Sequence, residues 1–226
     1  METKLFIHVG LMRTGTTFLQ RRVFPKIKNI NYNGKPRIEN VQIKEGMVNL
    51  ISREGLSAGP GRRRVIEPLK PKQRFIAADR LKAIFPDAKI IVGVRDKESW
   101  LQSFYRQQLK GGGWMSWEEF MNYCDGWLDF DKYINYLKKL FDDVYVYRFE
   151  DLKANPESVV KGICDFMGVE MPDCDLNPRN ASYTDYQLKT MTGFNKLCRS
   201  LFGDYIAREL HEGLRLAIDF VRRDRL

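Results

Sequence analysis

The fold is decided by residues 5–17, which read LFIHVGLMRTGTT. The apolar run 5–9 is short and continuous, as is typical of a strand buried on both faces of a parallel sheet. Gly10 and Gly15 follow with the spacing G-x-x-x-x-G, and residues 16–24 have the pattern of a helix. A loop of this kind between a strand and a helix presents backbone N–H groups that can hold a phosphate. A tight turn that simply needs two glycines is the structural alternative.

Similar apolar runs alternate with helical patterns along the rest of the chain. They predict strands at 47–52, 90–94 and 144–147, and helices at 74–85, 97–109, 156–167 and from 182 to the C-terminus. Strands separated by helices indicate a three-layer α/β fold, with a mostly parallel sheet and helices on both faces. The length of 226 residues fits one domain, residues 1–226. Ligands of such sheets bind outside the carboxyl ends of the strands, where we therefore expect the site.

The composition is that of a soluble globular protein, with 43% hydrophobic and 30% charged residues. Because no apolar run approaches the roughly 18 residues of a membrane span, none is expected. Residues 5–9 are too short for the core of a signal peptide, which predicts a cytoplasmic location. The cysteines lack C-x-x-C spacing and the chain has two histidines, so we expect free thiols and no metal site. The cysteines are Cys124, Cys164, Cys174 and Cys198.

The charge balance predicts an anionic partner without naming its class. Lysine and arginine total 38 against 29 acidic residues, a net charge of +9. Much of the excess falls between Arg53 and Lys82, where a solvated loop is the plainer reading. Because we find no zinc knuckle, no aromatic-rich RNA-binding signature and no helix-turn-helix, nucleic acid is not the expected partner.

The glycine loop differs from that of a nucleoside triphosphatase at one decisive position. Such an enzyme needs a lysine where Thr16 stands, to reach the β- and γ-phosphates. The cation of this loop is Arg13, three residues earlier. The loop therefore suits a single phosphate better than a triphosphate with magnesium, although a kinase with a degenerate loop remains an alternative.

Residues 10–17 resemble the 5′-phosphosulfate loop of sulfotransferases that use 3′-phosphoadenosine 5′-phosphosulfate (PAPS). The segment IIVGVRDKESWLQSFY is similar to the second element of that family. In that element, an arginine that ends a strand and a serine eight residues later hold the 3′-phosphate; here these are Arg95 and Ser103. The segment YRFEDL resembles the family's Y-E-D-L stretch, with Phe149 where a tyrosine often lies near the adenine. Asn180 to Ser182, followed by Asn195, resembles the C-terminal part of bacterial-type members.

The resemblance implies a sulfotransferase-type, P-loop-like fold with PAPS as the donor and 3′-phosphoadenosine 5′-phosphate (PAP) as the product. The activity implied is transfer of a sulfuryl group to a hydroxyl or amine. A nucleotide-binding protein of the same fold without activity is a further alternative. The donor-binding residues implied are Arg13, Thr14, Gly15, Thr16, Thr17, Arg95, Ser103 and Phe149.

Arg95 is a candidate anion ligand on physical grounds as well. It follows the most apolar strand of the chain and so lies at the carboxyl edge of the sheet. A guanidinium group offers a planar fork that matches two phosphate oxygens. The alternative is an ion pair with Asp96 or Glu98 that only closes the end of the strand.

Sulfuryl transfer needs a cation near the bridging oxygen and a base for the acceptor. Arg13 is the candidate cation, whereas Lys26 cannot be placed from sequence. Glu54 is the candidate base, because it follows a strand and because LISREGLS resembles an S-x-E-x-L-S stretch of bacterial-type sulfotransferases. The alternative is an ion pair of Glu54 with Arg53 or with the arginines 62–64. Among its rivals, His8 reads as a core histidine inside a strand, whereas His211 lies in a polar C-terminal helix.

Other features bear on the acceptor without identifying it. Asp79, in a predicted helix, reads as an exposed charge and a weaker candidate base. The segment 111–117, GGGWMSW, places two tryptophans beside glycines and suits either a lid over a sugar ring or plain core packing. Residues 62–64 are three arginines that suit an acidic polysaccharide or solvent. We expect a small-molecule or glycan acceptor, with carbohydrate, lipid headgroup and small alcohol all open, and the oligomeric state is unknown.

Overall fold

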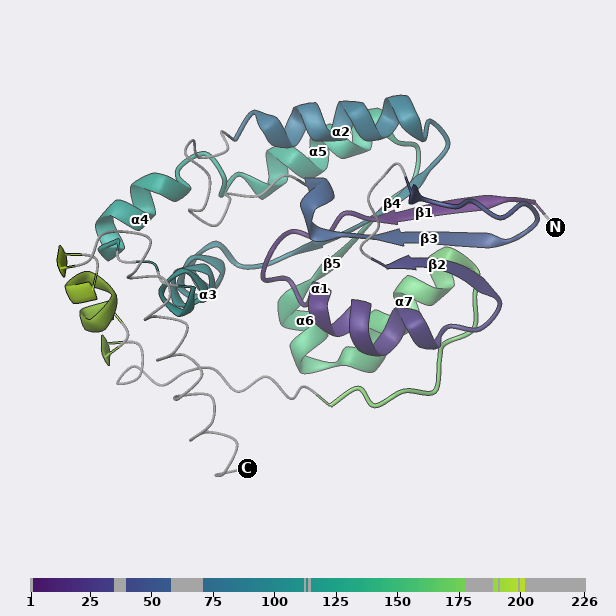
Figure 1. Cartoon of the computed structure of the whole chain (residues 1–226). Coiled ribbons are helices and arrows are strands. Elements are labelled where there is room, and N and C mark those ends of the chain that lie inside the picture. The colour runs from purple at the N-terminus through teal and green to yellow at the C-terminus, as the bar shows by residue number, and fades with distance from the viewer. Residues whose placement is uncertain are drawn as a thin grey trace. The chain divides into compact units, whose positions relative to one another are not determined.

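The computed structural model describes residues 2–34, 40–57, 71–111, 113, 115–177, 189–190, 192–198 and 200–201 (Figure 1). These residues fall into two compact units. The first unit contains the described residues up to 57, 71–100 and 126–177, and the second contains the remainder. Helix α3 (Lys97–Lys110) contributes residues to both.

The first unit is built on a five-stranded sheet in which every neighbouring pair of strands is parallel. The strand order is β2-β3-β1-β4-β5, so the strand before the glycine loop is central. In the register, Ile7 is paired with Ile51 on one side and with Ile90 on the other. The bounds are β1 Lys4–His8, β2 Ile30–Gly34, β3 Val48–Ser52, β4 Lys89–Val94 and β5 Val144–Arg148.

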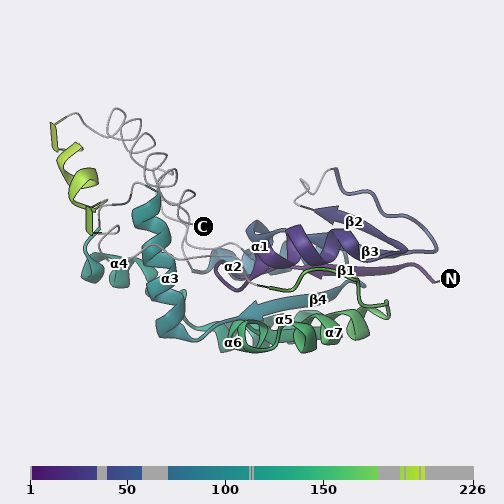
Figure 2. The same ribbon diagram turned by 90° about the horizontal axis from the view of Figure 1, so that it is seen from below.

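Helices cover both faces of this sheet (Figures 1 and 2). One face carries α1 (Thr16–Phe18), α6 (Phe149–Ala154) and α7 (Pro156–Met167), and the other carries α2 (Gln73–Ile84) and α5 (Phe130–Leu140). The predicted three-layer α/β fold is therefore confirmed. The chain remains helical past α1, through a π-helical turn at Leu19–Val23 and a 3₁₀ turn at Phe24–Lys26. The α- and π-helical part ends before Pro25, as predicted, and Pro25 occupies the first turn of the 3₁₀ segment, where no N–H is needed.

Successive side chains along each strand point to opposite faces of the sheet, so the core has two halves. Phe6, Leu50 and Ile91 pack in one cluster with side chains of the α1 and α7 layer. Ile7, Ile51 and Ile90, one residue away along each strand, are also fully buried. Because successive side chains point to opposite faces, they lie on the side that α2 and α5 cover. Burial of both faces explains why these strands read as continuous apolar runs.

Four elements were missed by the sequence analysis. Strand β2 has the sequence INYNG and lies at the edge of the sheet, where one neighbour suffices and no apolar run is required. Helix α4 (Trp117–Cys124) begins with a capping box, in which Ser116 Oγ accepts from the Glu119 N–H at 3.2 Å and the Glu119 carboxylate accepts from the Ser116 N–H at 2.7 Å. Helices α5 and α6 are the other two elements that were not predicted. Helix α5 is capped by Asp129, whose carboxylate accepts from the Lys132 N–H.

The second unit is a small helical cluster with an aromatic centre. The ring centres of Tyr105 and Phe120 lie 5.0 Å apart, and Trp117 packs edge-on against Tyr105 at 5.1 Å. Asn195 donates to the carbonyl oxygens of Leu109 and Gly113 at 3.2 and 3.0 Å. Trp117 is therefore part of this packing, whereas Trp114, the other tryptophan of the segment, lies outside the described residues.

All four cysteines are free thiols, as expected. Within the described part of the chain, no helix is long and apolar enough to cross a membrane. The same residues include no group of three or more histidine, cysteine or acidic side chains arranged to hold a metal ion.

Candidate active site

Neighbouring strands of the parallel sheet bring the main candidate residues to one edge. Strands β1, β3 and β4 end at His8, Ser52 and Val94, and they are adjacent in the sheet. The glycine loop, Glu54 and Arg95 follow those ends, so they share the carboxyl edge, where ligands of α/β proteins bind.

The loop between β1 and α1 is tightly folded and depends on its glycines. Gly10 and Gly15 have φ angles of +25° and +84°, in the left-handed region that disfavours other residues. A Cβ atom on Gly10 would lie 2.6 Å from the Thr16 hydroxyl, and one on Gly15 would overlap the side chain of Leu152. Arg13 also has a positive φ, of +67°, a conformation that costs energy in a residue with a side chain.

Two threonine hydroxyls of the loop are turned inward. Thr14 and Thr16 are buried, and the Thr14 hydroxyl donates to the carbonyl oxygen of Leu11 at 2.6 Å. Arg13 and Thr17, in contrast, are exposed. Among the predicted donor-binding residues, Thr14 and Thr16 therefore hold the loop through their hydroxyls, whereas Arg13 and Thr17 present their side chains to solvent.

A buried polar network supports the loop from below. The two ring nitrogens of His8 lie 2.7 Å from the Ser52 hydroxyl and 3.1 Å from the Tyr147 hydroxyl. Gln20 donates to the same Ser52 hydroxyl at 3.0 Å. The Tyr147 hydroxyl also interacts with the hydroxyls of Thr14 and Thr16.

Burial sets the protonation states in this network. It lowers the pKa of His8 to about 3, so the imidazole is neutral near pH 7. It also raises the pKa of Tyr147 above its ordinary value, which keeps the phenol protonated. The interpretation of His8 as a core histidine is confirmed. Neither Tyr147 nor Gln20 was singled out from sequence, although Gln20 is a polar residue on the otherwise apolar side of the first helix.

Arg95 links the loop to the start of α6. Its Nη1 donates to the carbonyl oxygen of Arg13 at 3.0 Å, and its guanidinium carbon lies 4.1 Å from the centre of the Phe149 ring. Burial lowers the pKa of Arg95, as does the charge of Arg13, while the carboxylates of Glu150 and Asp96 raise it. Phe149 also lies beneath Gly15, 3.6 Å from the position that a Cβ there would take.

Ser99 is the serine that contacts Arg95 in the structure. Its hydroxyl accepts from Arg95 Nε at 2.9 Å, and its N–H donates to the Asp96 carboxylate at the start of α3. The hydrogen bonds of Arg95 thus go to Ser99 and Arg13. The alternative considered from sequence, an ion pair with Asp96 or Glu98, is not the arrangement that these bonds form. Ser103 belongs to the second unit, and its role in holding the 3′-phosphate stays a prediction. Glu150 joins this corner by accepting from the Asp96 N–H at 3.0 Å.

Glu54 is the first residue of a 3₁₀ turn, Glu54–Ser57, that follows β3. The turn is attached to the glycine loop, because the Ser57 hydroxyl lies 3.2 Å from the carbonyl oxygen of Gly10. Glu54 is half-buried, and its charge contributes to the raised pKa of Tyr147. The structure therefore brings Glu54 to the same corner as the loop.

The remaining candidates lie elsewhere. Lys26 ends the 3₁₀ turn at the far end of the helical segment from the loop. Asp79 is exposed on α2, where it accepts from the Tyr136 hydroxyl at 2.6 Å, so its interpretation as an exposed charge is confirmed. His211, the arginines 62–64 and the segment 180–182 lie outside the described residues.

Comparison with known proteins identifies the family and the fold. A family model described as the sulfotransferase family matches residues 32–173, which include Glu54, Arg95 and Phe149 and follow the glycine loop. A sulfotransferase from Alicyclobacillus acidocaldarius shares the fold. It is 18% identical, and the match covers 92% of this chain and 100% of that one with a TM-score of 0.57.

Two further matches have TM-scores below 0.5. Mouse sulfotransferase SULT7A1, crystallised with PAP, is 15% identical, with 85% of this chain and 63% of that one covered and a TM-score of 0.43. The sulfotransferase domain from the curacin biosynthetic pathway is 16% identical, with 76% and 77% covered and a TM-score of 0.48. Comparison with curated protein sequences gives no match. Since the family model spans more than half of the 226 residues, the chain belongs to the sulfotransferase family.

Proposed function

We propose that this protein transfers the sulfuryl group of PAPS to a hydroxyl or amine of a small-molecule or glycan acceptor and releases PAP. The observation that carries the proposal is the position of Arg95. It is hydrogen-bonded to the backbone of the glycine loop and stacked on Phe149. A cation that can bind a phosphate, a loop that can hold a second phosphate and an aromatic ring therefore meet at one corner. A nucleotide with separate 5′ and 3′ anionic groups offers one anion to the loop, one to Arg95 and a base to Phe149.

The loop suits the 5′ end of the donor. Its glycines allow the positive φ angles that close the loop, and Arg13 supplies the cation. Because Thr14 and Thr16 are committed to the interior, the backbone N–H groups and Thr17 are the groups that we assign to the phosphate. The Arg95 guanidinium takes the 3′-phosphate, and Phe149 lies beside the base.

PAPS, when bound, supplies the sulfuryl group: its sulfur bonds to the acceptor oxygen or nitrogen as the bond from sulfur to the bridging phosphate oxygen breaks. Arg13 stabilises the negative charge that grows on the leaving phosphate. Glu54 accepts the proton that the acceptor loses, which keeps the charge balanced. The buried network of His8, Ser52 and Tyr147 holds the loop and the turn of Glu54 in place.

The donor class is tested by thermal unfolding with PAP, AMP, and ATP with and without magnesium. Selective stabilisation by PAP is expected, since only PAP carries both phosphates. Preference for ATP with magnesium would indicate a kinase instead. Transfer of radioactive sulfate from PAPS to a panel of sugars, phenols and amines then separates an enzyme from a protein that binds PAP without turnover.

A further inference from the structure

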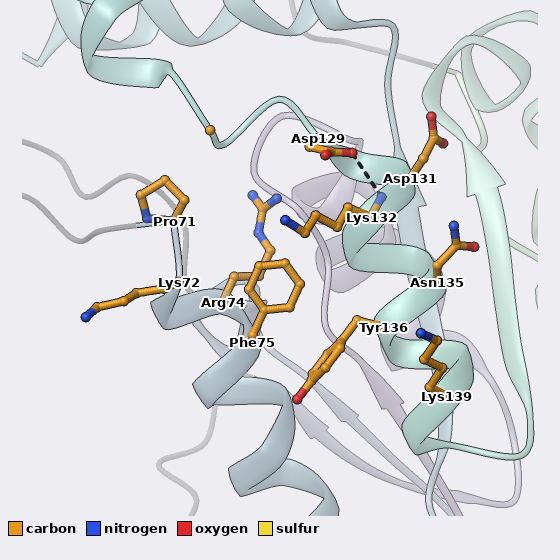
Figure 3. Close-up of a pocket in the computed structure, with 11 residues that line it drawn as sticks. Pro71, Lys72, Arg74, Phe75, Asp129, Asp131, Lys132, Asn135, Tyr136 and Lys139 are labelled. Atoms are coloured by element: carbon orange, nitrogen blue, oxygen red, sulfur yellow. Dashed lines mark hydrogen bonds between the residues drawn. The ribbon is translucent and has the colours of Figure 1, made fainter.

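A cavity of about 890 Å³ lies between α2 and α5, on the helical layer opposite α1 and α7 (Figure 3). Its walls come from the beginning of α2 and from residues along most of the length of α5, together with residues that precede each helix. None of the residues assigned to the donor or to the transfer step lines it. The cavity is therefore separate from the candidate active site.

The floor of the cavity holds a buried arginine that has no counter-charge among the described residues. Arg74 is 3% exposed, and its Nη1 donates to the carbonyl oxygen of Trp127 at 3.1 Å, while its Nε has no hydrogen-bond partner. Burial lowers the pKa of Arg74 to about 10, so it still carries its charge near pH 7. In the described part of the chain, no carboxylate forms an ion pair with it. A buried guanidinium normally has such a partner, because removing a charge from water is costly.

A second unsatisfied polar atom lies next to this arginine. The hydroxyl of Tyr133, on α5, is buried and has no hydrogen-bond partner. Its ring centre is 5.0 Å from the Arg74 guanidinium, and the rings of Trp127 and Phe130 complete the surroundings at 4.9 and 5.9 Å. Buried polar atoms are almost always paired with protein, water or a bound ion. Because Arg74 lines the cavity while Tyr133 does not, the unpaired Nε of Arg74 is the group that indicates a missing acceptor there.

The rim adds positive charge and an aromatic wall. Lys132 and Arg74 point into the same space (Figure 3). With Lys72 and Lys139 they make four cations, against the carboxylates of Asp129 and Asp131. Asp129 is already engaged in capping α5.

The aromatic wall is formed by Phe75 and Tyr136. Their ring centres are 5.0 Å apart in an edge-to-face pair. The hydrogen bond from the Tyr136 hydroxyl to Asp79 holds one of these rings in place. A fixed pair of rings beside the cationic floor offers a surface for a flat ligand.

We propose that this cavity binds a ring-bearing anion, an aromatic or sugar compound with one carboxylate or sulfate group. The anionic group pairs with Arg74 and Lys132, and the ring lies against Phe75 and Tyr136. Among the described lining residues, four cations stand against two carboxylates, which favours a monoanion over a neutral ligand. This site is independent of the donor site and of the transfer reaction.

Naphthalene-2-sulfonate is a suitable probe, with naphthalene-2-methanol as its neutral counterpart. Calorimetry with the full chain, in the presence of saturating PAP, excludes binding of the sulfonate to the glycine loop. We expect one sulfonate per chain and at least tenfold weaker binding of the alcohol. Equal binding of the two compounds, or no binding of the sulfonate, overturns the proposal.

Matched variants on α5 test the location. Lys132→Ala removes a rim cation and should weaken sulfonate binding about threefold, whereas Lys138→Ala, an exposed lysine of the same helix that does not line the cavity, should leave it unchanged. Asp131→Asn removes a carboxylate and should strengthen binding by a similar factor. Arg74→Met should abolish binding. If that variant does not fold, opposite changes of sulfonate affinity in Lys132→Ala and Asp131→Asn still locate the binding site in the cavity. Identical sulfonate affinities in the two variants would refute this location.

Discussion

The imidazole Nε2 of His8 lies 3.1 Å from the phenolic oxygen of Tyr147, and this contact joins β1 to β5 across the strand between them. The crossing is possible because Gly93 of β4 has no side chain: a Cβ atom there would overlap the ring and hydroxyl of Tyr147. The hydroxyl then reaches Thr14 and Thr16 of the glycine loop. The loop is thus supported by a strand that is not its neighbour in the sheet.

The first prediction concerns this crossing. Gly93→Ala should displace the Tyr147 ring and destabilise the protein by about 1–3 kcal/mol, as overpacking of a core does. It should also weaken PAP binding, because the loop loses its support. Urea denaturation and calorimetry measure the two effects. Gly193→Ala is the control, since nothing lies within 4 Å of its added Cβ. Unchanged stability in Gly93→Ala would contradict the contact between His8 and Tyr147 past Gly93.

The second prediction is a pH dependence of stability. The pKa of His8 is lowered by burial from 6.5 to about 3, so between these values the unfolded chain binds a proton that the folded chain does not. The contribution of His8 is therefore fully present above pH 6.5 and is lost as the pH falls toward 3. Its slope is at most about 1.4 kcal/mol per pH unit. Urea denaturation from pH 7 to pH 4 should show a flatter profile for His8→Gln than for the wild type, and parallel profiles would refute the assignment.

The third prediction concerns the 3′-phosphate. Arg95→Ala should weaken PAP binding about 10- to 100-fold, because a charge-assisted hydrogen bond contributes roughly 1.5–3 kcal/mol. Arg80→Ala, an exposed arginine of α2, is the matched control and should bind PAP normally. Calorimetry gives the affinities, and circular dichroism checks that both variants are folded. A wild-type PAP affinity in Arg95→Ala would remove this residue from the donor site.

The fourth prediction separates binding from chemistry at Glu54. Glu54→Gln should bind PAP as the wild type does but transfer sulfate at least about 100-fold more slowly, the usual contribution of a general base. Glu157→Gln, an exposed glutamate at the start of α7, should retain activity. Steady-state kinetics with PAPS and an acceptor from the panel provide the measurement. Normal turnover in Glu54→Gln would exclude it as the base.

Elements are predictable from sequence where the pattern of neighbouring residues follows directly from their place in the fold. The segment 5–17 predicts strand, loop and helix because a strand covered on both faces must be apolar and a loop that curves around an anion must have glycines. The position of Arg95 at the carboxyl edge was predictable because this residue directly follows the most apolar strand. Phe149, in contrast, was found through resemblance alone, and its stacking on Arg95 emerged only in the structure.

Several contacts could not have been anticipated in this way. Ser99 and Ser103 lie on the same predicted helix, and only the direction of the Arg95 side chain selects Ser99 as its partner. Asp129 was not recognised as the start of a helix, because α5 follows a short irregular stretch. The buried charge of Arg74 was unforeseeable, since an arginine in a helix is ordinarily exposed.

The order of residues along the chain alone determined the alternation of strands and helices, the glycine loop and the arginine after β4, because these depend on neighbouring residues. Tertiary structure alone decided that His8 reaches Tyr147 past Gly93, that Arg95 binds the backbone of Arg13, and that Arg74 is enclosed by aromatic rings. These contacts join residues tens of positions apart. Their partners are chosen by the order of strands in the sheet and by the space between helices, which no local pattern encodes.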